Sequence, residues 1–500
     1  MRTTFISLLR TAILAVGGTC AMAMAQVPLC VDPSFQAPFM EIGISDIDFM
    51  PDGRILVCGH MRNPIPAQQP SSFAVNRLWL DGAIDPAFHQ LAGSSGIVRI
   101  WNDDYFFSAG GIGIRRHFLD GTVDPSFQGA DSPAFWISSG GDLHVFPDDR
   151  LWRAGLFSKQ LYDEEGQYIG SEQGYGLLQL QPDGVPDPDF DHKYVAPGWL
   201  TSIRETPDGR FLFGSASGTQ YEGRPVGRIL RVWPDGHLDT TFHSTIYWGQ
   251  VSRNYYFYPD GRILAFGQFQ TPEYPGDTLA VVRLHPDGST DTTWPVIPFR
   301  NPQYFFPGLA YVIDFLEIEP GRLIIVGDFD TVDGQPAGGI AAIDTAGNVL
   351  WDYFTGSDAG ELQLSIGGTN RYLRGIKEAP DGYIYIYGSY HGFDDGYANH
   401  PDQRMITRLY PLHVGMEERT PDRAVQVYPN PASDRLTIQV ADENGQGIKQ
   451  VRLLDATGRE ALLSTMRGPL LQLDVSGLQG LFLVLVEGNG ERYTERIIIH

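Results

Sequence analysis

The chain alternates short apolar segments with turn-forming residues in a pattern that returns along most of its length. One half of this pattern is Pro-Asp-Gly-Arg followed by an apolar run that ends in glycine, and clear copies start at residues 51, 207 and 259. Altered copies start near residues 102, 147, 320 and 380. Self-similarity at a regular spacing is the signature of a repeat architecture. The pattern therefore predicts seven repeats.

The other half of each repeat is a strand, an Asp-Gly turn and an Asp-x-x-Phe or Asp-x-x-Trp turn. Its copies cover residues 77–88, 120–127, 183–190, 235–242 and 287–294, with a worn copy at 340–354. Asp-Gly between alternating strands is a strong hairpin signal, and we expect a type I′ turn with positive φ at both central residues. Two hairpins in each repeat predict a four-stranded unit of roughly fifty to sixty residues, which is the size of a β-propeller blade.

The two ends of the repeat array complement each other. Residues 31–35, Val-Asp-Pro-Ser-Phe, form a second-half turn with no first half before them, and the last repeat ends at residues 405–410 without such a turn. We therefore predict that residues 31–35 complete the last blade and close the ring. The expected fold is all-β, a seven-bladed β-propeller over residues 26–411 that is closed by its N-terminal strand.

The repeat motifs resemble the delta-60 repeat of bacterial secreted and surface proteins. That family has Asp-Gly-Lys/Arg, an apolar strand and glycine, and then Arg-Leu-x-x-Asp-Gly-x-x-Asp-x-x-Phe. The resemblance covers about residues 31–412, and the chain departs from the pattern at 101–111 and 340–354. It implies a propeller fold and supplies no established activity.

The C-terminal part of the chain has a different pattern. Residues 412–424 are polar and unrepeated, which predicts a linker, and about seven short strand patterns in residues 425–500 predict a small Ig-like β-sandwich. This segment resembles the type A C-terminal sorting domain of the type IX secretion system. The matching positions are Tyr428, Pro429, Asn430, Pro431, Asp455, Gly458, Leu478, Gly480 and Phe482, where phenylalanine stands in place of the usual tyrosine.

The resemblance of residues 425–500 implies a partner and a route. It implies that this domain engages the type IX secretion machinery, that the protein passes through the periplasm, and that it ends up secreted or on the outer cell surface. The N-terminus agrees with export, because Arg2 and Arg10 accompany a short apolar run that ends in Ala-Met-Ala. We expect residues 1–25 to be a signal peptide that is cleaved between Ala25 and Gln26.

Charge and cysteine content narrow the classes of partner and scaffold. Loss of Arg2 and Arg10 with the signal peptide would change the net charge from −24 to −26, which disfavours a nucleic-acid partner. No segment approaches the roughly 20 apolar residues of a membrane helix, so we expect no transmembrane segment. Only Cys30 and Cys58 would remain, and a chain of this length with at most one disulfide needs a large apolar core.

The sequence contains no recognised catalytic or cofactor-binding motif. Asp328, Asp330 and Asp333 resemble a Ca²⁺ loop with shifted spacing, but they fit a repeat hairpin equally well. Tyrosines at 383, 385 and 387 share one strand face and suit either packing between blades or stacking on a sugar. The long insertions at residues 158–174 and 390–403 are the places where a repeat scaffold usually carries function.

Three functions are compatible with these features. The first is a non-enzymatic secreted or surface propeller that binds a glycan or an extracellular protein. The second is a secreted polysaccharide hydrolase or lyase with carboxylates at the propeller funnel. The third is a purely structural role. Carboxylates with raised pKa values at the funnel would favour the hydrolase, whereas apolar residues or turn-capping aspartates there would count against it.

Overall fold

In the computed structural model the chain divides into two units, residues 1–414 and 415–500. The structure describes residues 29–62, 73–89, 91–92, 96–110, 113–129, 135–190, 193–196, 198–301, 309–354, 356–364, 369–396, 398–411, 425–428, 432–440, 448–455, 459–468, 470–488 and 491–499. Both units are built of antiparallel strands, and a short 3-10 turn, Trp351–Tyr353, is the sole helical element within these ranges. None of the helical structure described there is long and apolar enough to cross a membrane.

Each repeat forms its own antiparallel sheet, in which the second strand lies between the first and the third. The first sheet contains β1 (Met40–Phe49), β2 (Ile55–Arg62), β3 (Phe73–Leu78) and β4 (Leu91–Ala92), and the second contains β5 (Ile97–Ile100), β6 (Tyr105–Gly110) and β7 (Gly113–Phe118). The third contains β8 (Phe135–Val145), β9 (Leu151–Tyr162) and β10 (Tyr168–Leu180), extended by β11 (Lys193–Ala196), β14 (Gln220–Tyr221) and β15 (Arg224–Pro225). The fourth contains β12 (Leu200–Glu205), β13 (Phe211–Ser215) and β16 (Ile229–Val232).

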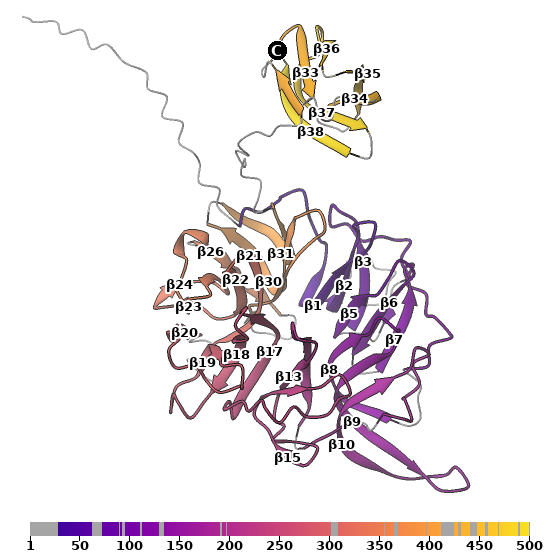
Figure 1. The fold of residues 1–500 in the computed structure, drawn as a ribbon, viewed down its shortest axis with the longest axis vertical. Helices are drawn as coiled ribbons and strands as arrows, with labels where there is room; N and C mark the ends of the chain where they lie inside the picture. The colour runs from indigo at the N-terminus through magenta and orange to yellow at the C-terminus, as the bar shows by residue number, and fades with distance from the viewer. Residues whose placement is uncertain are drawn as a thin grey trace, which may run out of the picture. The chain divides into compact units, whose positions relative to one another are not determined.

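The remaining repeat sheets follow the same order. The fifth contains β17 (Trp248–Phe257), β18 (Ile263–Gln270) and β19 (Leu279–Leu284), and the sixth contains β21 (Tyr311–Glu319), β22 (Arg322–Asp328) and β25 (Ile340–Asp344). The last contains β26 (Ser357–Ala359), β29 (Tyr372–Glu378), β30 (Ile384–Asp395) and β31 (Asn399–Leu409). Two small ladders accompany them: β20 (Phe299–Arg300) with β23 (Thr331–Val332) and β24 (Gln335–Pro336), and β27 (Leu362–Gln363) with β28 (Thr369–Asn370). In Figure 1 the indigo first sheet lies beside the orange last sheet, and β1 packs against β30.

The turn inside the first hairpin differs from the expected type. The Gly53 N–H donates to the Met50 carbonyl at 2.9 Å, and the Met50 N–H donates to the Arg54 carbonyl at 2.8 Å. Gly53 has a φ of +85°, but Asp52 does not have a positive φ. The turn is therefore a type I turn followed by a left-handed glycine, and the type I′ prediction was wrong. Pro51 fixes its own φ near that of a type I turn, and Asp52 Oδ1 accepts from the Arg54 N–H at 3.1 Å.

The Asp-x-x-Phe turns join each sheet to the next one. Asp85 Oδ2 accepts from Arg77 Nε at 2.8 Å, and Arg77 Nη1 donates to the Leu119 carbonyl of the second sheet at 2.7 Å. Phe88 packs in one buried cluster with Phe106, also of the second sheet. The same arrangement recurs at later junctions, through Arg116 with Asp124 and the Pro182 carbonyl, and through Arg231 with Asp239 and the Pro286 carbonyl. These aromatic residues pack between neighbouring sheets, as predicted.

The N-terminal segment pairs with the last repeat sheet. Val31 forms an antiparallel bridge with Leu409 of β31. The Asp32 N–H donates to the Arg408 carbonyl at 2.9 Å, and Arg408 Nη2 lies 2.7 Å from Asp32 Oδ2. Asp32 therefore pairs with Arg408 in the same way as Asp85 pairs with Arg77.

The same segment also contacts the first sheet. Arg408 Nη1 donates to the Leu80 carbonyl, which is the bond that links neighbouring sheets elsewhere. Phe35 is fully buried in a cluster that contains Ile47 of β1 and Tyr385 of β30. The segment therefore contacts both the last and the first repeat sheet.

The predicted long loops are strand pairs in the structure. Residues 158–174 form the outer end of the β9–β10 hairpin, and residues 390–403 form the outer end of the β30–β31 pair. Because β9 runs antiparallel to β8, Phe135 at the start of β8 pairs with Lys159 near the end of β9. The hairpin ends therefore extend on the side of each sheet where its first strand begins.

The second unit contains two sheets. One consists of β32 (Val425–Tyr428), β33 (Arg435–Val440) and β36 (Leu470–Asp474), and the other of β35 (Glu460–Arg467), β34 (Ile448–Asp455), β37 (Gly480–Gly488) and β38 (Glu491–Ile499). Leu436 and Ile438 of the first sheet share a buried cluster with Val451 and Val484 of the second. This is the two-sheet sandwich that the sequence pattern predicts.

Candidate functional site

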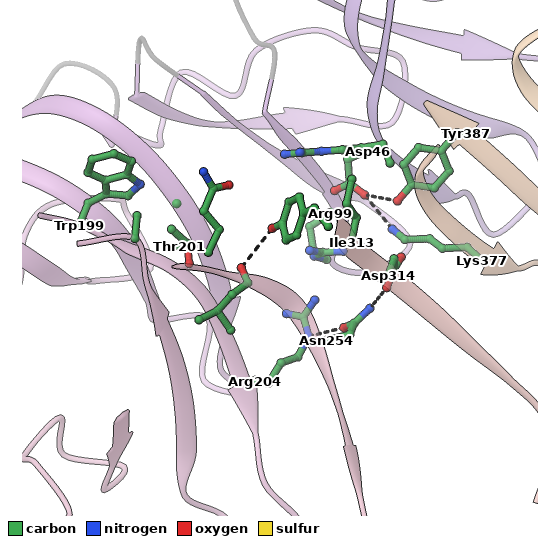
Figure 2. Close-up of a pocket in the computed structure, with 16 residues that line it drawn as sticks. Asp46, Arg99, Trp199, Thr201, Arg204, Asn254, Ile313, Asp314, Lys377 and Tyr387 are labelled. Carbon is green, nitrogen blue, oxygen red and sulfur yellow. Dashed lines mark hydrogen bonds and ion pairs between the residues drawn. The ribbon is translucent and has the colours of Figure 1, made fainter. Parts of the chain in front are cut away.

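A cavity of about 330 Å³ lies between the first strands of the repeat sheets in the first unit. Every repeat contributes at least one residue to its wall: Asp46 from β1, Arg99 from β5, Gly141 from β8, Arg204 from β12, Asn254 from β17, Asp314 from β21 and Lys377 from β29. Figure 2 shows these strands converging on the cavity with their polar side chains directed at one another. The centre of the unit is therefore polar, not a continuation of the apolar core.

Three buried aspartates connect neighbouring first strands. Asp46 Oδ1 accepts from the Ile47 N–H at 3.0 Å, and its Oδ2 accepts from the Val98 N–H of β5 at 3.4 Å. The equivalent bonds to the next strand are Asp142 Oδ2 to the Ile203 N–H at 3.2 Å and Asp314 Oδ2 to the Ile376 N–H at 3.3 Å. Each carboxylate thus satisfies backbone donors on two sheets at once.

Cationic side chains on the intervening strands pair with these aspartates. Arg204 Nη1 lies 2.8 Å from Asp142 Oδ2, and Arg99 Nη2 lies 3.6 Å from Asp142 Oδ1. Lys377 Nζ lies 3.0 Å from Asp46 Oδ1. Acidic and basic residues therefore alternate from strand to strand around the cavity.

Asn254 links the remaining members. Its Oδ1 accepts from Arg204 Nε at 2.7 Å, and its Nδ2 donates to Asp314 Oδ1 (Figure 2). We call the whole set the central ring: Asp46, Arg99, Asp142, Arg204, Asn254, Asp314 and Lys377. With three aspartates, two arginines, one lysine and one amide, the central ring carries no net charge.

The electrostatics of the central ring follow from burial and pairing. Burial raises the pKa of Asp314, although Asn254 and two backbone N–H groups favour its charged form. Burial acts against the charge of Arg99, but Asp46 and Asp142 outweigh it and raise the pKa of the Arg99 guanidinium. The oxygens of these carboxylates accept from backbone N–H groups and from cationic or amide side chains of neighbouring sheets. The carboxylates therefore link the sheets to one another.

The tyrosine row on β30 takes part in packing and in the ring. Tyr385 is buried against Phe35 and Phe49, with ring centroids 5.4 Å and 5.3 Å apart. The Tyr387 hydroxyl donates to Asp46 Oδ1 at 3.3 Å. Contacts between sheets, the first of the two interpretations, account for both residues.

The candidate Ca²⁺ residues have other partners. Asp328 Oδ1 accepts from Asn301 Nδ2 at 2.5 Å, and burial raises the pKa of Asp328 to about 6. Asp330 forms an ion pair with Arg371, and Asp333 has a φ of +47° in the turn. Within the described part of the chain, no group of three metal-ligating side chains is placed to hold an ion. Ca²⁺ binding at these residues stays a prediction.

The sorting-motif residues lie at strand ends of the second unit. Tyr428 ends β32 and its hydroxyl donates to Gln439 at 3.1 Å, while Asp455 ends β34 and accepts from the Arg459 N–H at 3.0 Å. Gly480 begins β37, Leu478 precedes it, and Phe482 is buried. Pro429, Asn430, Pro431, Gly458 and the predicted cleavage site at Ala25 and Gln26 lie outside the described residues.

Sequence reasoning missed the central ring, although a signal was present. Asp46, Asp142 and Asp314 each stand seven residues before the turn residue with positive φ, which is Gly53, Asp149 or Gly321. Arg99, Arg204 and Lys377 stand five residues before the corresponding turn position of the other repeats. Aligning the repeats on their turns, not only on their apolar strands, reveals these columns.

Comparison with protein families agrees with this architecture. Residues 426–500 match the secretion system C-terminal sorting domain. Residues 51–88, 206–242 and 259–293 match a β-propeller domain of unknown function, DUF5122. No curated protein matches the chain. The protein is therefore a secretion-sorted, all-β repeat protein of the propeller class.

Solved structures give only distant likenesses. PorZ of Porphyromonas gingivalis, an essential surface component of the type IX secretion system, is 11% identical over 92% of this chain and 82% of its own, with a TM-score of 0.30. A protein of unknown function from Bacteroides caccae is 14% identical over 60% of this chain and 92% of its own, with a TM-score of 0.30. A gluconolactonase of Xanthomonas campestris is 18% identical over 59% of this chain and 95% of its own, with a TM-score of 0.30.

The family matches identify the two kinds of domain in this chain. The chain carries DUF5122-type propeller repeats and ends in a sorting domain of the type IX secretion system. That sorting domain directs the protein to the cell surface or into the medium.

Proposed function

We propose that the first unit is a seven-bladed β-propeller closed by residues 29–35. The support is the bridge between Val31 and Leu409, together with the Arg408 bond to the Leu80 carbonyl of the first sheet. The cavity adds to this support because the first strand of each repeat contributes to its wall. A closed ring leaves only short, protected strand edges, which suits a protein exposed outside the cell.

We further propose that this propeller is a non-enzymatic binding module whose central cavity holds a glycan. The observation that carries the proposal is the cavity itself, which is lined by both polar and aromatic side chains, including Trp199, Tyr311 and Tyr387. A sugar ring offers apolar faces for stacking and hydroxyls for hydrogen bonds, so it matches such a wall. The hairpin ends at 158–174 and 390–403 extend on the side where the first strands begin and suit a rim for a longer ligand.

The proposal is tested by glycan-array binding of the purified full-length protein, with and without Ca²⁺. Trp199→Ala removes an aromatic wall of the cavity, and we expect it to weaken binding about tenfold, equivalent to about 1.4 kcal/mol. Trp233→Ala is the matched control, because Trp233 is 44% exposed and outside the cavity. Equal effects of the two substitutions would place the ligand elsewhere, and a requirement for Ca²⁺ would support the prediction at Asp328, Asp330 and Asp333.

A second function, a polysaccharide hydrolase or lyase, is favoured by one observation. Asp46 and Asp314 both line the cavity, and burial raises the pKa of Asp314, which is a feature of catalytic acids. The other contacts of both carboxylates support the binding module instead. Both accept from backbone N–H groups, Asp46 pairs with Lys377, and Asp314 accepts from Asn254. Mass spectrometry of the bound sugars separates the two: intact sugars support binding, and shortened or unsaturated sugars support catalysis.

A further inference from the structure

Arg374 brings a positive charge into the cavity that the central ring does not balance. It is on β29, three residues before Lys377, and its side chain lines the cavity. The charged side chains that line the cavity are two acids and four bases: Asp46, Asp314, Arg99, Arg204, Arg374 and Lys377. Among the residues that the structure describes, the Arg374 side chain has no carboxylate partner and no hydrogen bond.

Other donors in the cavity wall are also without partners. The Thr201 hydroxyl is buried and makes no hydrogen bond. The Trp199 indole and the Gln250 amide line the same cavity, and neither side chain is hydrogen-bonded within the described ranges. Buried donors normally have partners, so the unpaired Thr201 hydroxyl beside the cavity points to a group that accepts from it. The Trp199 indole is half-buried and the Gln250 amide is exposed, and both are open to the same group.

Strand pairing places Arg374 and Thr201 in the same layer of the cavity. On the first strand of the sixth sheet, Asp314 pairs with Val326 of the second strand. The equivalent pairs are Ser202 with Gly214 in the fourth sheet and Gly375 with Tyr387 in the last sheet. Arg374 and Thr201 each come one residue before that position. Both therefore lie on the side of the central ring where the first strands begin, and the ring forms the floor of the cavity on that side.

The carboxylates of the floor do not compete for Arg374. Asp46 already accepts from Lys377, Tyr387 and two backbone N–H groups. Asp314 accepts from Asn254 and two backbone N–H groups. An incoming anion thus meets a guanidinium with free donors, and guanidinium binds carboxylate or sulfate with two parallel hydrogen bonds.

We propose that the cavity binds an acidic sugar and that Arg374 receives its carboxylate or sulfate group. Thr201 and Gln250 donate to the same anionic group or to the neighbouring hydroxyls, and Trp199 and Tyr311 contact the sugar ring. The proposal rests on the function proposed above, because it names the ligand class of that cavity. It also explains why a chain of net charge −24 places an arginine without an ion-pair partner in the wall of this cavity.

The test is titration calorimetry on the purified full-length protein with matched ligands. The ligands are oligogalacturonate and its neutral methyl ester, sulfated and unsulfated dextran fragments, and inorganic sulfate. We expect one of the charged oligosaccharides to bind at least tenfold more tightly than its neutral counterpart. We also expect rising NaCl to weaken that binding, since screening reduces the attraction of a charged ligand.

Two variants and a control assign the effect to Arg374. Arg374→Gln should lower the affinity for the charged oligosaccharide at least tenfold and leave the affinity for the neutral one unchanged. Arg374→Lys keeps the charge but loses the two-bond geometry, so it should retain an intermediate affinity. Arg224→Gln makes the same charge change at an exposed position on β15 and should have no effect. Unchanged melting temperatures show that the variants are folded.

The other outcomes separate this inference from the proposed function. Equal binding of charged and neutral oligosaccharides, unaffected by Arg374→Gln, would overturn the acidic-sugar inference while the sugar-binding cavity stood. Inorganic sulfate binding as tightly as the sulfated fragment would also overturn it, because the sugar would then contribute nothing. Absence of binding to every sugar in the titrations and on the array would overturn both.

Discussion

Asp46, Asp142 and Asp314 each hold two strands together with a single carboxylate. One oxygen accepts from the N–H of the following residue, and the other accepts from an N–H on the first strand of the next sheet. A cation or an amide from a neighbouring strand completes each pair. Because an unpaired buried charge is costly, removing either partner should destabilise the fold more than removing an exposed pair.

We predict that Asp142→Asn lowers the free energy of unfolding by about 3 kcal/mol, because it leaves Arg204 without its buried counterion and removes one of the carboxylates that act on Arg99. Asp148→Asn is the control on the same sheet, since Asp148 is 63% exposed and pairs with Arg150 at the surface. That substitution should cost no more than about 1 kcal/mol. Urea denaturation of both variants measures the difference, and equal midpoints would contradict a structural role for the central ring.

His117 is a second residue whose environment has a measurable consequence. Its Nε2 lies 2.8 Å from Ser108 Oγ, and its ring stacks on Phe106 with centroids 4.8 Å apart. The side chain is buried, and burial, with a contribution from Arg115, lowers the pKa of His117 to about 4. The folded protein therefore binds this proton less readily than the unfolded chain does.

This shift predicts a loss of stability in acid. Above about pH 6.5 the imidazole is neutral in both the folded and the unfolded state, so its pKa shift does not change the free energy of unfolding. As the pH falls towards 4, only the unfolded chain takes up the proton, and the free energy of unfolding falls. The full penalty is about 3 kcal/mol. His117→Gln should therefore lose less stability than the parent between pH 7 and pH 4.5 in urea denaturation. His89→Gln, at an exposed histidine, should follow the parent, and parallel curves for all three proteins would refute the assignment.

At the scale of the element, the two kinds of turn in each repeat have different structural roles. The Asp-Gly turns close hairpins through a left-handed glycine, and in one altered copy Asp149 takes that conformation with a φ of +66°. The Asp-x-x-Phe turns connect sheets, because the aspartate holds an arginine that reaches the next sheet. An altered motif therefore still forms a hairpin at residues 147–150.

At the scale of the whole molecule, the N-terminal segment of the first unit pairs with its last strand. Cys30, Val31 and Asp32 pair with Leu409 and its two neighbours in the manner of a continued sheet. One of these contacts, from the Val31 N–H to Asp395, joins residues that are 364 positions apart. The stability of the first unit should therefore depend on this short N-terminal segment.

We predict that Val31→Cys with Leu409→Cys forms a disulfide in a Cys30→Ser background. The bonds at Cys30 and Asp32 make residues 31 and 409 a non-hydrogen-bonded antiparallel pair, whose Cα atoms are about 4.5 Å apart, within the range of a disulfide. The cross-linked chain should migrate faster on a non-reducing gel. Val31→Cys with Leu284→Cys is the control, because Leu284 holds the equivalent place in the fifth sheet. A disulfide in the control, or none in the test pair, would argue against closure by residues 29–35.

The sequence by itself determined the strand-and-turn repeats, the all-β class and the sorting domain. These depend on local signals: an Asp-Gly turn needs only its own residues, and the motif from Tyr428 to Phe482 is read in order along the chain. Complementary ends at residues 31–35 and 405–410 also predicted that the N-terminal segment would pair with the last repeat. The turn type was wrong because proline and the aspartate side chain favour the type I form.

Only the tertiary structure decided what lies at the centre. Asp46 and the Val98 N–H are 52 residues apart, and each member of the central ring has its partners on other sheets. The ion pairs of the central ring join different repeats: Asp142 pairs with Arg204, and Asp46 pairs with Lys377. The sequence of one repeat therefore predicts neither the central ring nor the position of Arg374 in the cavity wall. The cavity exists because the strands are brought side by side by packing that acts between repeats, and its chemistry belongs to the assembled ring.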